Sequence, residues 1–277
     1  MVTRQDADAE RRFGGLRRLY GSEGAQRLFD AHVLVVGIGG VGSWVAEALA
    51  RSGVGRITLI DMDHVAESNV NRQVHALTST LGQSKVLAMS DRIHQIHPQA
   101  CTQTIDDFVS PDNWHALLDG AGQVVSVDAV VDACDQRAAK AVMAAWAASS
   151  GVGFVTVGAA GGKTQAHRVE VADLSEVTHD PLLAQLRQRL RKYHGAPRQG
   201  AMGIECVFSR ESVRLPADAC EATDGSLNCH GYGSSVAVTA AFGMVAAGHV
   251  MSALAAPQKK RTKNRWRSER AEKQHII

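Results

Sequence analysis

The feature of the sequence that most constrains the fold is a buried apolar run that ends in a cluster of glycines. Residues 32–36 (His-Val-Leu-Val-Val) are typical of a strand covered on both faces in a parallel sheet. The glycines come next: Gly37, Gly39, Gly40 and Gly42. Residues 43–52 then have the apolar spacing of a helix, and a second apolar strand, 56–60, ends at Asp61. This order predicts a βαβ unit of the kind that binds nucleotides.

The alternation of strands and helices continues along the chain. We expect further helices over residues 85–96, 113–118, 135–149 and 181–193, and further strands over 101–105, 124–131, 154–157, 164–171, 204–208 and 212–215. The pattern predicts an α/β fold with a doubly wound, mostly parallel, Rossmann-like sheet and an added C-terminal sheet and crossover region. We expect one domain over 1–258, with a nucleotide-binding half at about 12–158 and a crossover half at about 159–258, followed by a basic tail, 259–277.

A glycine loop lets the following helix begin close to a phosphate, whose charge meets free N–H groups and the positive end of the helix dipole. An acid such as Asp61, at the end of the next strand, can bond ribose hydroxyls. On these features alone NAD and ATP fit equally well, and a tight turn without a ligand also remains open. The polar residues that follow favour ATP: Asp63, Ser68, Asn69, Arg72, Lys85, Asp132 and Asp135.

Attack on a nucleoside triphosphate needs fixed cations and a metal ligand around the phosphates, whereas hydride transfer does not. Arg72 and Lys85 can supply the cations, and Asp135 or Asp132 can bind the metal. Either aspartate could instead cap the helix that follows, and either cation could be a surface charge.

On these residues the chain resembles the adenylation domain of the ubiquitin-activating-enzyme-like superfamily, of the ThiF/MoeB type, which includes the bacterial sulfur-carrier adenylases. The resemblance is carried by residues 37–73, Lys85 and residues 132–135. It implies that ATP is bound by Gly40, Asp61, Asn69, Arg72 and Lys85, and that Asp135 serves Mg²⁺. It also implies a homodimer in which an arginine of the N-terminal segment, expected to be Arg18, reaches the partner's phosphates.

The cysteines do not support a structural zinc site. Sulfur-carrier adenylases hold zinc through two Cys-x-x-Cys pairs, and none of the five cysteines here belongs to such a pair. With residues 12–21, 106–113 and 180–182, the whole chain instead resembles the tRNA threonylcarbamoyladenosine dehydratases. That resemblance implies a ligase-class enzyme that uses ATP to activate the threonyl carboxylate, after which a nucleophile of the same modified base closes a ring. A cysteine desulfurase or sulfur-acceptor system is a further implied partner.

One cysteine could take part in the chemistry. Cys229 lies just before the last apolar segment, where a thiolate could face the site. It could carry a thioester, as in relatives that pass the acyl group to a thiol, or it could pack against or line the site.

A tRNA substrate predicts basic surface in two places. The helix over 181–193 carries Arg187, Arg191 and Lys192, and the tail carries Lys259, Lys260 and Arg261 with Trp266 placed to stack on a base. The formal charge of +2 is the sum of two unlike parts, because residues 1–258 carry −4 and the tail carries +6. A solvated helix face and a solubilising tail are the alternatives.

One segment could be mistaken for a membrane span. Residues 235–256 are apolar and long enough to cross a bilayer, and the basic tail behind them would suit its cytoplasmic flank. Their Ala, Val and Gly content, together with His249, favours a buried helix. The charged N-terminal segment is unlike a secretory signal, and the odd number of cysteines argues against a disulfide framework, so we expect a cytoplasmic protein.

Three functions therefore remain in competition. The first is the RNA-modifying dehydratase. The second is an adenylase for the C-terminal carboxylate of a sulfur-carrier or ubiquitin-like protein, which the missing zinc cysteines disfavour. The third is a non-catalytic nucleotide-binding partner module, which the joint presence of Arg72, Lys85 and Asp135 disfavours.

Overall fold

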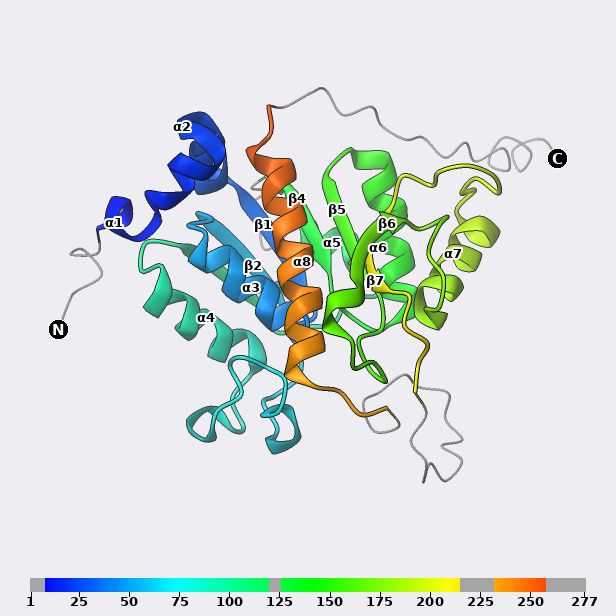
Figure 1. The fold of residues 1–277 in the computed structure, drawn as a ribbon, viewed down its shortest axis with the longest axis horizontal. Coiled ribbons are helices and arrows are strands. Elements are labelled where there is room, and N and C mark those ends of the chain that lie inside the picture. Colours follow the sequence, from blue (N-terminus) through cyan, green and yellow to red (C-terminus); the bar gives the residue numbers. More distant parts are fainter. Residues whose placement is uncertain (1–7, 120–125, 215–231, 258–277) are drawn as a thin grey trace.

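A computed structural model describes residues 8–119, 126–214 and 232–257, and it is organised around a seven-stranded sheet (Figure 1). The strand order is β3-β2-β1-β4-β5-β7-β6, and every neighbouring pair is parallel except β6 and β7. The strands are β1 His32–Val36, β2 Arg56–Ile60, β3 Cys101–Ile105, β4 Ala129–Asp132, β5 Gly153–Val157, β6 Val169–Asp173 and β7 Glu205–Ser209. The doubly wound, mostly parallel sheet is confirmed.

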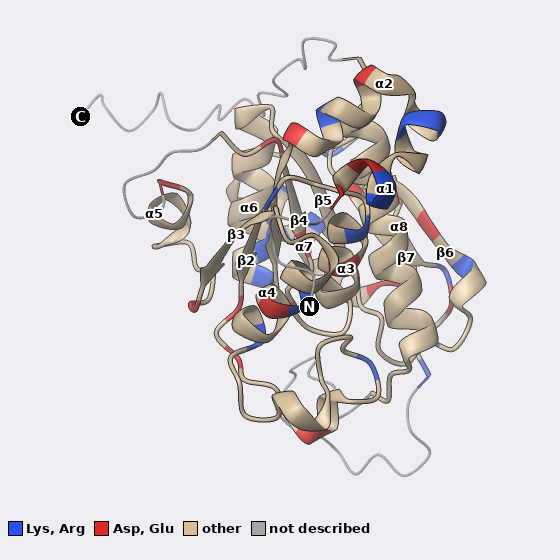
Figure 2. Ribbon diagram, turned by 90° about the vertical axis from the view of Figure 1, so that its left-hand side faces the viewer, with Lys and Arg blue, Asp and Glu red and all other residues tan. Residues whose placement is uncertain are grey.

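Helices cover both faces of this sheet. They are α1 Ala9–Phe13, α2 Gly15–Asp30, α3 Gly42–Arg51, α4 Lys85–Ile96, α5 Trp114–Asp119, α6 Arg137–Ser150, α7 Pro181–Tyr193 and α8 Val236–Ala255, with short 3₁₀ turns η2 Glu67–Asn69, η3 Thr78–Thr80 and η5 Ala166–Arg168. Figure 2 shows α5 and α6 on one side of the sheet and α8 on the other.

Strand β1 explains why the sheet has a core on each face. All five of its residues are buried, and successive side chains of a strand point to opposite faces. Val33 and Val35 join the core cluster that includes residues of α3, α4 and α8, whereas Leu34 and Val36 join the cluster that includes residues of α6 and α7. An apolar run without alternation is therefore what this central position requires.

Helix α8 is long and apolar enough to cross a membrane by length and composition. Its inner residues Phe242, Ala246 and Val250 are buried in the same core cluster as α3. Gly243 permits this close approach, because a Cβ atom there would lie 2.7 Å from both the Trp44 Cβ atom and the Val41 carbonyl oxygen. The helix thus packs as a core helix of the fold.

Several sequence expectations need correction. The strand expected over 124–131 begins, among the described residues, only at Ala129, and residues 124 and 125 lie outside them. The helix α2, which bends at Gly21 (φ 73°), was not foreseen in the charged N-terminal segment. The strand expected over 164–171 begins only at Val169, because residues 166–168 form η5. Residues 212–214 form no strand, and residue 215 lies outside the described part of the chain.

Candidate active site

A cavity of about 950 Å³ opens at the carboxyl ends of β1, β2, β4 and β5, where a doubly wound sheet binds its ligands. One end is lined by the glycine loop, by the residues after β2 and by the loop after β4. The other end is lined by residues 158–161 after β5, by the start of α7 and by Tyr232. Most of the residues that the sequence singled out for ATP therefore share one space.

The glycine loop needs glycine at specific positions. Gly37 has a positive φ of 85°, and a Cβ atom there would lie 2.8 Å from the Cys134 amide nitrogen. At Gly42 a Cβ atom would collide with the Gly37 carbonyl oxygen. Within the described residues, the N–H groups of Gly39 and Gly40 form no hydrogen bond. The start of α3 can therefore offer free N–H groups to a phosphate.

Asp61 connects the glycine loop to the segment after β2. Its Oδ2 atom accepts from the Ile38 N–H at 2.6 Å, and its Oδ1 atom accepts from the Asp63 N–H at 2.8 Å. Burial raises the pKa of the Asp61 carboxyl, and the nearby Lys85 ammonium acts in the opposite direction. The carboxylate lies where the ribose of a nucleotide would be expected.

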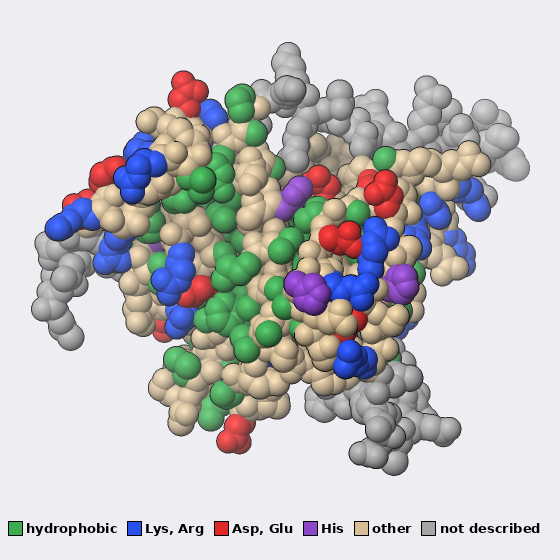
Figure 3. Space-filling view, in the orientation of Figure 1, with side chains coloured by type: hydrophobic (Ala, Val, Ile, Leu, Met, Phe, Trp, Pro, Cys, Tyr) green, Lys and Arg blue, Asp and Glu red, His purple; other side chains and the backbone are tan. Residues whose placement is uncertain are grey.

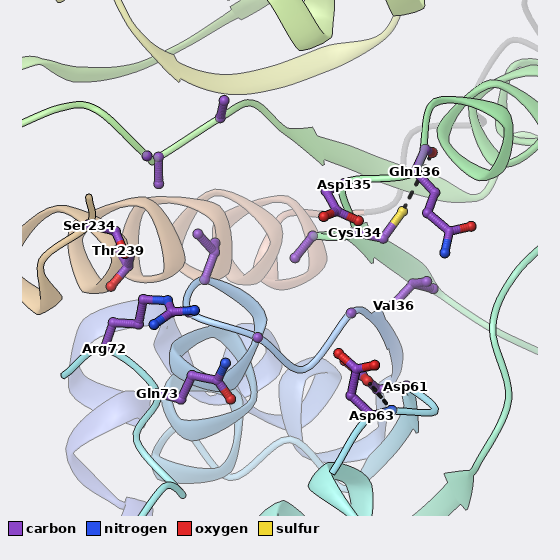
Figure 4. A pocket seen from close by; sticks show the side chains of 18 of the residues that line it. Val36, Asp61, Asp63, Arg72, Gln73, Cys134, Asp135, Gln136, Ser234 and Thr239 are labelled. Carbon is purple, nitrogen blue, oxygen red and sulfur yellow. Dashed lines mark hydrogen bonds between the residues drawn. The ribbon is translucent and has the colours of Figure 1, made fainter. Parts of the chain in front are cut away.

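The two candidate cations are both held in place. The Lys85 ammonium is buried and lies 2.6 Å from the Asp63 carboxylate. The Arg72 guanidinium donates to the Ser68 carbonyl at 2.7 Å and to the Asn71 side chain at 2.9 Å. Figure 4 shows Arg72 on one side of the cavity, Asp61 and Asp63 near the glycine loop, and Asp135 facing them.

The two aspartates after β4 have different environments. Asp132 is fully buried, with its Oδ2 atom 3.1 Å from the Lys140 ammonium and 2.6 Å from the Thr156 hydroxyl. Burial alone would lower the pKa of Lys140, but the neighbouring Asp132 carboxylate outweighs burial and raises it. Asp135 is exposed and lines the cavity. Of the two alternatives, only Asp135 is free to meet a metal ion.

The carboxylate of Asp135 fits Mg²⁺ in particular. Within the described residues there is no group of three or more His, Cys, Asp or Glu side chains that could hold a metal ion. Mg²⁺ usually keeps several waters and is bound by one or two carboxylates together with substrate phosphates. An exposed carboxylate such as that of Asp135, beside a phosphate site, is consistent with that donor set.

Sequence reasoning missed several residues that line the cavity. They are Gln73, Asp107, Phe108, Cys134, Pro181, Leu182 and Tyr232. Cys134 is the most reactive type among them, but burial and the Asp132 carboxylate, 3.1 Å from its Sγ atom, raise the pKa of the thiol well above its ordinary value. The thiol is therefore protonated at neutral pH and donates a hydrogen bond instead of acting as a nucleophile.

Asp180 shapes the second half of the cavity. Its carboxylate is buried and accepts from the Ala159 N–H at 2.9 Å and from the Leu183 N–H at 3.0 Å, so it joins the loop after β5 to the start of α7. Burial raises the pKa of this carboxyl, and the two N–H donors oppose the shift. The Asp-Pro-Leu sequence at 180–182 thus forms both a helix cap and a wall of the cavity.

The remaining predicted residues lie elsewhere. Arg18 is exposed on α2 and does not line the cavity. Arg187 donates to the Leu174 and Val177 carbonyls, Arg191 donates to the Pro197 carbonyl, and Lys192 is exposed beside the Tyr193 ring. The other predicted residues lie outside the described part of the chain: Cys229, Lys259, Lys260, Arg261 and Trp266.

Comparisons with known proteins agree with this geometry. The model of the ThiF family matches residues 13–275. The tRNA threonylcarbamoyladenosine dehydratase of Escherichia coli is 44% identical over 88% of this chain and 94% of its own length, and that of Haemophilus influenzae is 41% identical over the same shares.

Solved structures of the Escherichia coli dehydratase have the same fold. Its complex with ATP has a TM-score of 0.79 at 40% identity, covering 92% of this chain and 96% of that one. Its complex with AMP has a TM-score of 0.80 at 42% identity, covering 90% and 96%. By its motifs, its fold and these matches over nearly its whole length, the chain belongs to the ThiF family, in the branch of the tRNA threonylcarbamoyladenosine dehydratases.

Proposed function

We propose that this protein uses ATP to dehydrate threonylcarbamoyladenosine in tRNA, by activating the threonyl carboxylate so that the modified base closes a ring. The observation that carries the proposal is the cavity, which has two chemically different halves in one continuous space. The half around Asp61, Arg72 and Lys85 suits a nucleoside triphosphate. The half around residues 158–161 and Leu182 leaves room for a second, less charged substrate group.

In the first step a carboxylate oxygen of the threonyl group attacks the α-phosphorus of ATP. A new P–O bond forms, the bond to the β-phosphate oxygen breaks, and pyrophosphate leaves. Lys85 and Arg72 would match the negative charge that moves onto the phosphate oxygens, while the free N–H groups of Gly39 and Gly40 hold the phosphates from the other side. Mg²⁺, held by Asp135, would supply further positive charge at the phosphates when bound.

In the second step a nucleophile that is already part of the modified base attacks the activated carbonyl carbon. The carbon–oxygen bond to AMP breaks, AMP leaves with that oxygen, and the proton of the nucleophile is released. Because nucleophile and acid belong to one molecule, the protein mainly has to hold the reacting groups together and exclude water. The mechanism requires no protein thiol, in agreement with the protonated state of Cys134.

We infer that the protein works as a homodimer. Arg18 supports this, since it is exposed and forms no hydrogen bond or ion pair with the described residues, so its guanidinium is available to a second copy. The charged N-terminal segment and the odd number of cysteines support a cytoplasmic location. In the proposed dimer, Arg18 of one protomer would reach the phosphates bound by its partner.

The test is incubation of the protein with ATP, Mg²⁺ and tRNA that carries threonylcarbamoyladenosine, followed by mass spectrometry of the nucleosides. We expect a product that is lighter by one water, and no product when Arg72→Ala replaces the wild type. An unchanged nucleoside, in a reaction where ATP binding is demonstrated separately, would refute the proposed function.

A further inference from the structure

The rim of the cavity next to β6 and β7 is held together by a buried lysine. Lys163 is buried, with 2% of the residue exposed. Its ammonium group donates to three backbone carbonyls, those of Glu211 at 2.7 Å, Ser209 at 3.0 Å and His179 at 3.5 Å. These carbonyls belong to two different stretches of the chain, and Lys163 itself to a third. One side chain therefore joins the three segments that form this rim.

A buried carboxylate fixes the same rim from the other direction. The Glu211 carboxylate accepts from the Thr164 and Gln165 N–H groups at 2.8 to 3.1 Å and from the Thr164 hydroxyl at 3.0 Å. The Arg214 N–H also donates to the Gly162 carbonyl at 2.8 Å. Burial of two charged side chains is costly unless their hydrogen bonds are made. Here the hydrogen bonds of Lys163 and Glu211 hold the backbone of the loops in place.

These ordered segments carry exposed arginines. Arg210 directly follows β7, and Arg168 directly precedes β6. Val169 pairs with Ser209 in the antiparallel register, so Arg168 and Arg210 lie opposite each other at that end of the two strands. Strand β7 runs parallel to β5, and its carboxyl end is therefore at the same edge of the sheet as the cavity.

The third arginine extends this row to the cavity itself. Arg214 is exposed and follows Val213, which lines the cavity. In these segments the exposed basic groups are three guanidinium groups. Two of them face a carboxylate: the Arg210 Nε atom lies 2.6 Å from Glu170, and the Arg214 Nε atom lies 3.7 Å from the buried Glu211 carboxylate. Figure 3 shows basic and histidine side chains on the face over β6 and β7, with acidic side chains among them.

We propose that Arg168, Arg210 and Arg214 form a phosphate-binding surface for the RNA strand that carries the modified adenosine. This inference rests on the proposed function, because it places the rest of the tRNA once the nucleoside occupies the cavity. A strand that leaves the cavity on this side must cross the rim, and guanidinium groups fit phosphate oxygens in a bidentate manner. The Lys163 and Glu211 network would then hold the arginines in place before the RNA binds.

The backbone at the edge of this surface is also unusual. His179 has a φ of 59°, and among the described residues it is the one residue other than glycine with a positive φ. Its carbonyl is one of the three that Lys163 holds. The network therefore maintains a conformation that an L residue rarely adopts, which is common at binding sites.

The experiment compares the wild type with the triple variant Arg168→Gln, Arg210→Gln and Arg214→Gln. We expect the KM for tRNA to rise at least tenfold while the KM for ATP stays within about twofold. In a plot of log affinity against log salt concentration, counterion release contributes about 0.7 to the slope for each single-strand phosphate contact. Loss of three such contacts should therefore reduce the magnitude of the slope by about 2. The control Arg56→Gln removes an exposed arginine at the start of β2, at the opposite edge of the sheet, and should change neither quantity.

If the triple variant keeps the wild-type KM for tRNA and its salt slope, this surface is not where the RNA binds. If the triple variant no longer binds ATP, the single variant Arg168→Glu replaces it, since the Arg168 side chain bonds only the Gln165 side chain among the described residues. If Arg168→Glu does not weaken tRNA binding, the proposal is wrong. Absence of dehydration by the wild type would instead contradict the proposed function.

Discussion

Lys85 and Asp63 form an ion pair at the phosphate end of the cavity, with the ammonium nitrogen 2.6 Å from the carboxylate oxygen. The Lys85 N–H also donates to the Asp63 carbonyl at 2.9 Å. Asp63 in turn donates its N–H to Asp61, which accepts from the Ile38 N–H in the glycine loop. One chain of hydrogen bonds therefore fixes the position of the lysine relative to the loop that would hold the phosphates.

If Asp63 acts through Lys85, the effects of removing the two residues should not add. We expect Asp63→Ala to lower the rate of pyrophosphate release about tenfold, because a cation displaced from the reacting phosphate stabilises the transition state less. The same substitution in a Lys85→Ala background should have little further effect. Rates of pyrophosphate release for the four proteins of this cycle test the prediction, and additive losses would assign Asp63 an independent role.

The buried pair of Asp132 and Lys140 should matter for stability. Lys140→Met leaves the Asp132 carboxylate buried without its counter-ion, and such changes cost about 3 to 5 kcal/mol. Asp132→Asn combined with Lys140→Met removes both charges and should cost less than the single change. Urea unfolding measures both values, and a loss below about 1 kcal/mol for Lys140→Met would contradict this role.

His75 should make the protein less stable in mild acid. Burial, followed by the Lys85 and Arg92 charges, lowers the pKa of its imidazole to about 4, and neither ring nitrogen has a hydrogen-bond partner among the described residues. Because the unfolded chain binds a proton near pH 6.5 and the folded chain near 4, stability rises with pH across this range, by about 3 kcal/mol at most. The contribution is complete above pH 6.5 and is lost as the pH falls to 4.

Replacement of the His75 imidazole by a ring that cannot be protonated isolates its contribution to the pH dependence of the unfolding free energy. The wild type should lose more unfolding free energy than His75→Phe between pH 7 and pH 4, measured by urea unfolding at each pH. His167→Phe provides a matched substitution at an exposed histidine. Equal pH dependence in the wild type and His75→Phe would show that His75 is not protonated on unfolding.

The basic tail should strengthen tRNA binding. Residues 259–277 carry a net charge of +6, and their removal should weaken tRNA binding and flatten its dependence on salt. Filter binding at several salt concentrations gives both quantities. An unchanged affinity would leave the tail with a solubilising role.

Local patterns in the sequence were sufficient for much of the fold. The bounds of β1, β2, β3, α4 and α7 match the expectations, because each is an apolar or amphipathic run with a clear start or stop signal. Helix α2 was missed since Gly15, Gly21 and Gly24 interrupt its pattern. Gly24 is needed where α2 meets α8, with a Cβ position 3.1 Å from the Ala255 carbonyl oxygen, and that contact joins residues far apart in the chain.

In the candidate site, too, some features follow from local sequence and others from contacts between residues far apart in the chain. The residues that line the cavity near the glycine loop could be singled out from the sequence, because they follow strand ends or lie in the segment after β2. By residue type alone Asp132 and Asp135 were both candidates for the metal, and the family resemblance favoured Asp135. The structure adds a physical reason, since Asp132 is buried against Lys140. The rim arginines could not be predicted, because Arg168 and Arg210 become neighbours only through the antiparallel pairing of β6 and β7.

The most direct test of the proposed mechanism follows the oxygen that is lost. tRNA is prepared with ¹⁸O in the threonyl carboxylate of its threonylcarbamoyladenosine and is then incubated with the protein, ATP and Mg²⁺. Attack of that carboxylate on the α-phosphorus predicts one ¹⁸O atom in the AMP for each labelled oxygen lost from the nucleoside. Dehydration that leaves the AMP unlabelled, or that places the label in orthophosphate with release of ADP, would contradict the account.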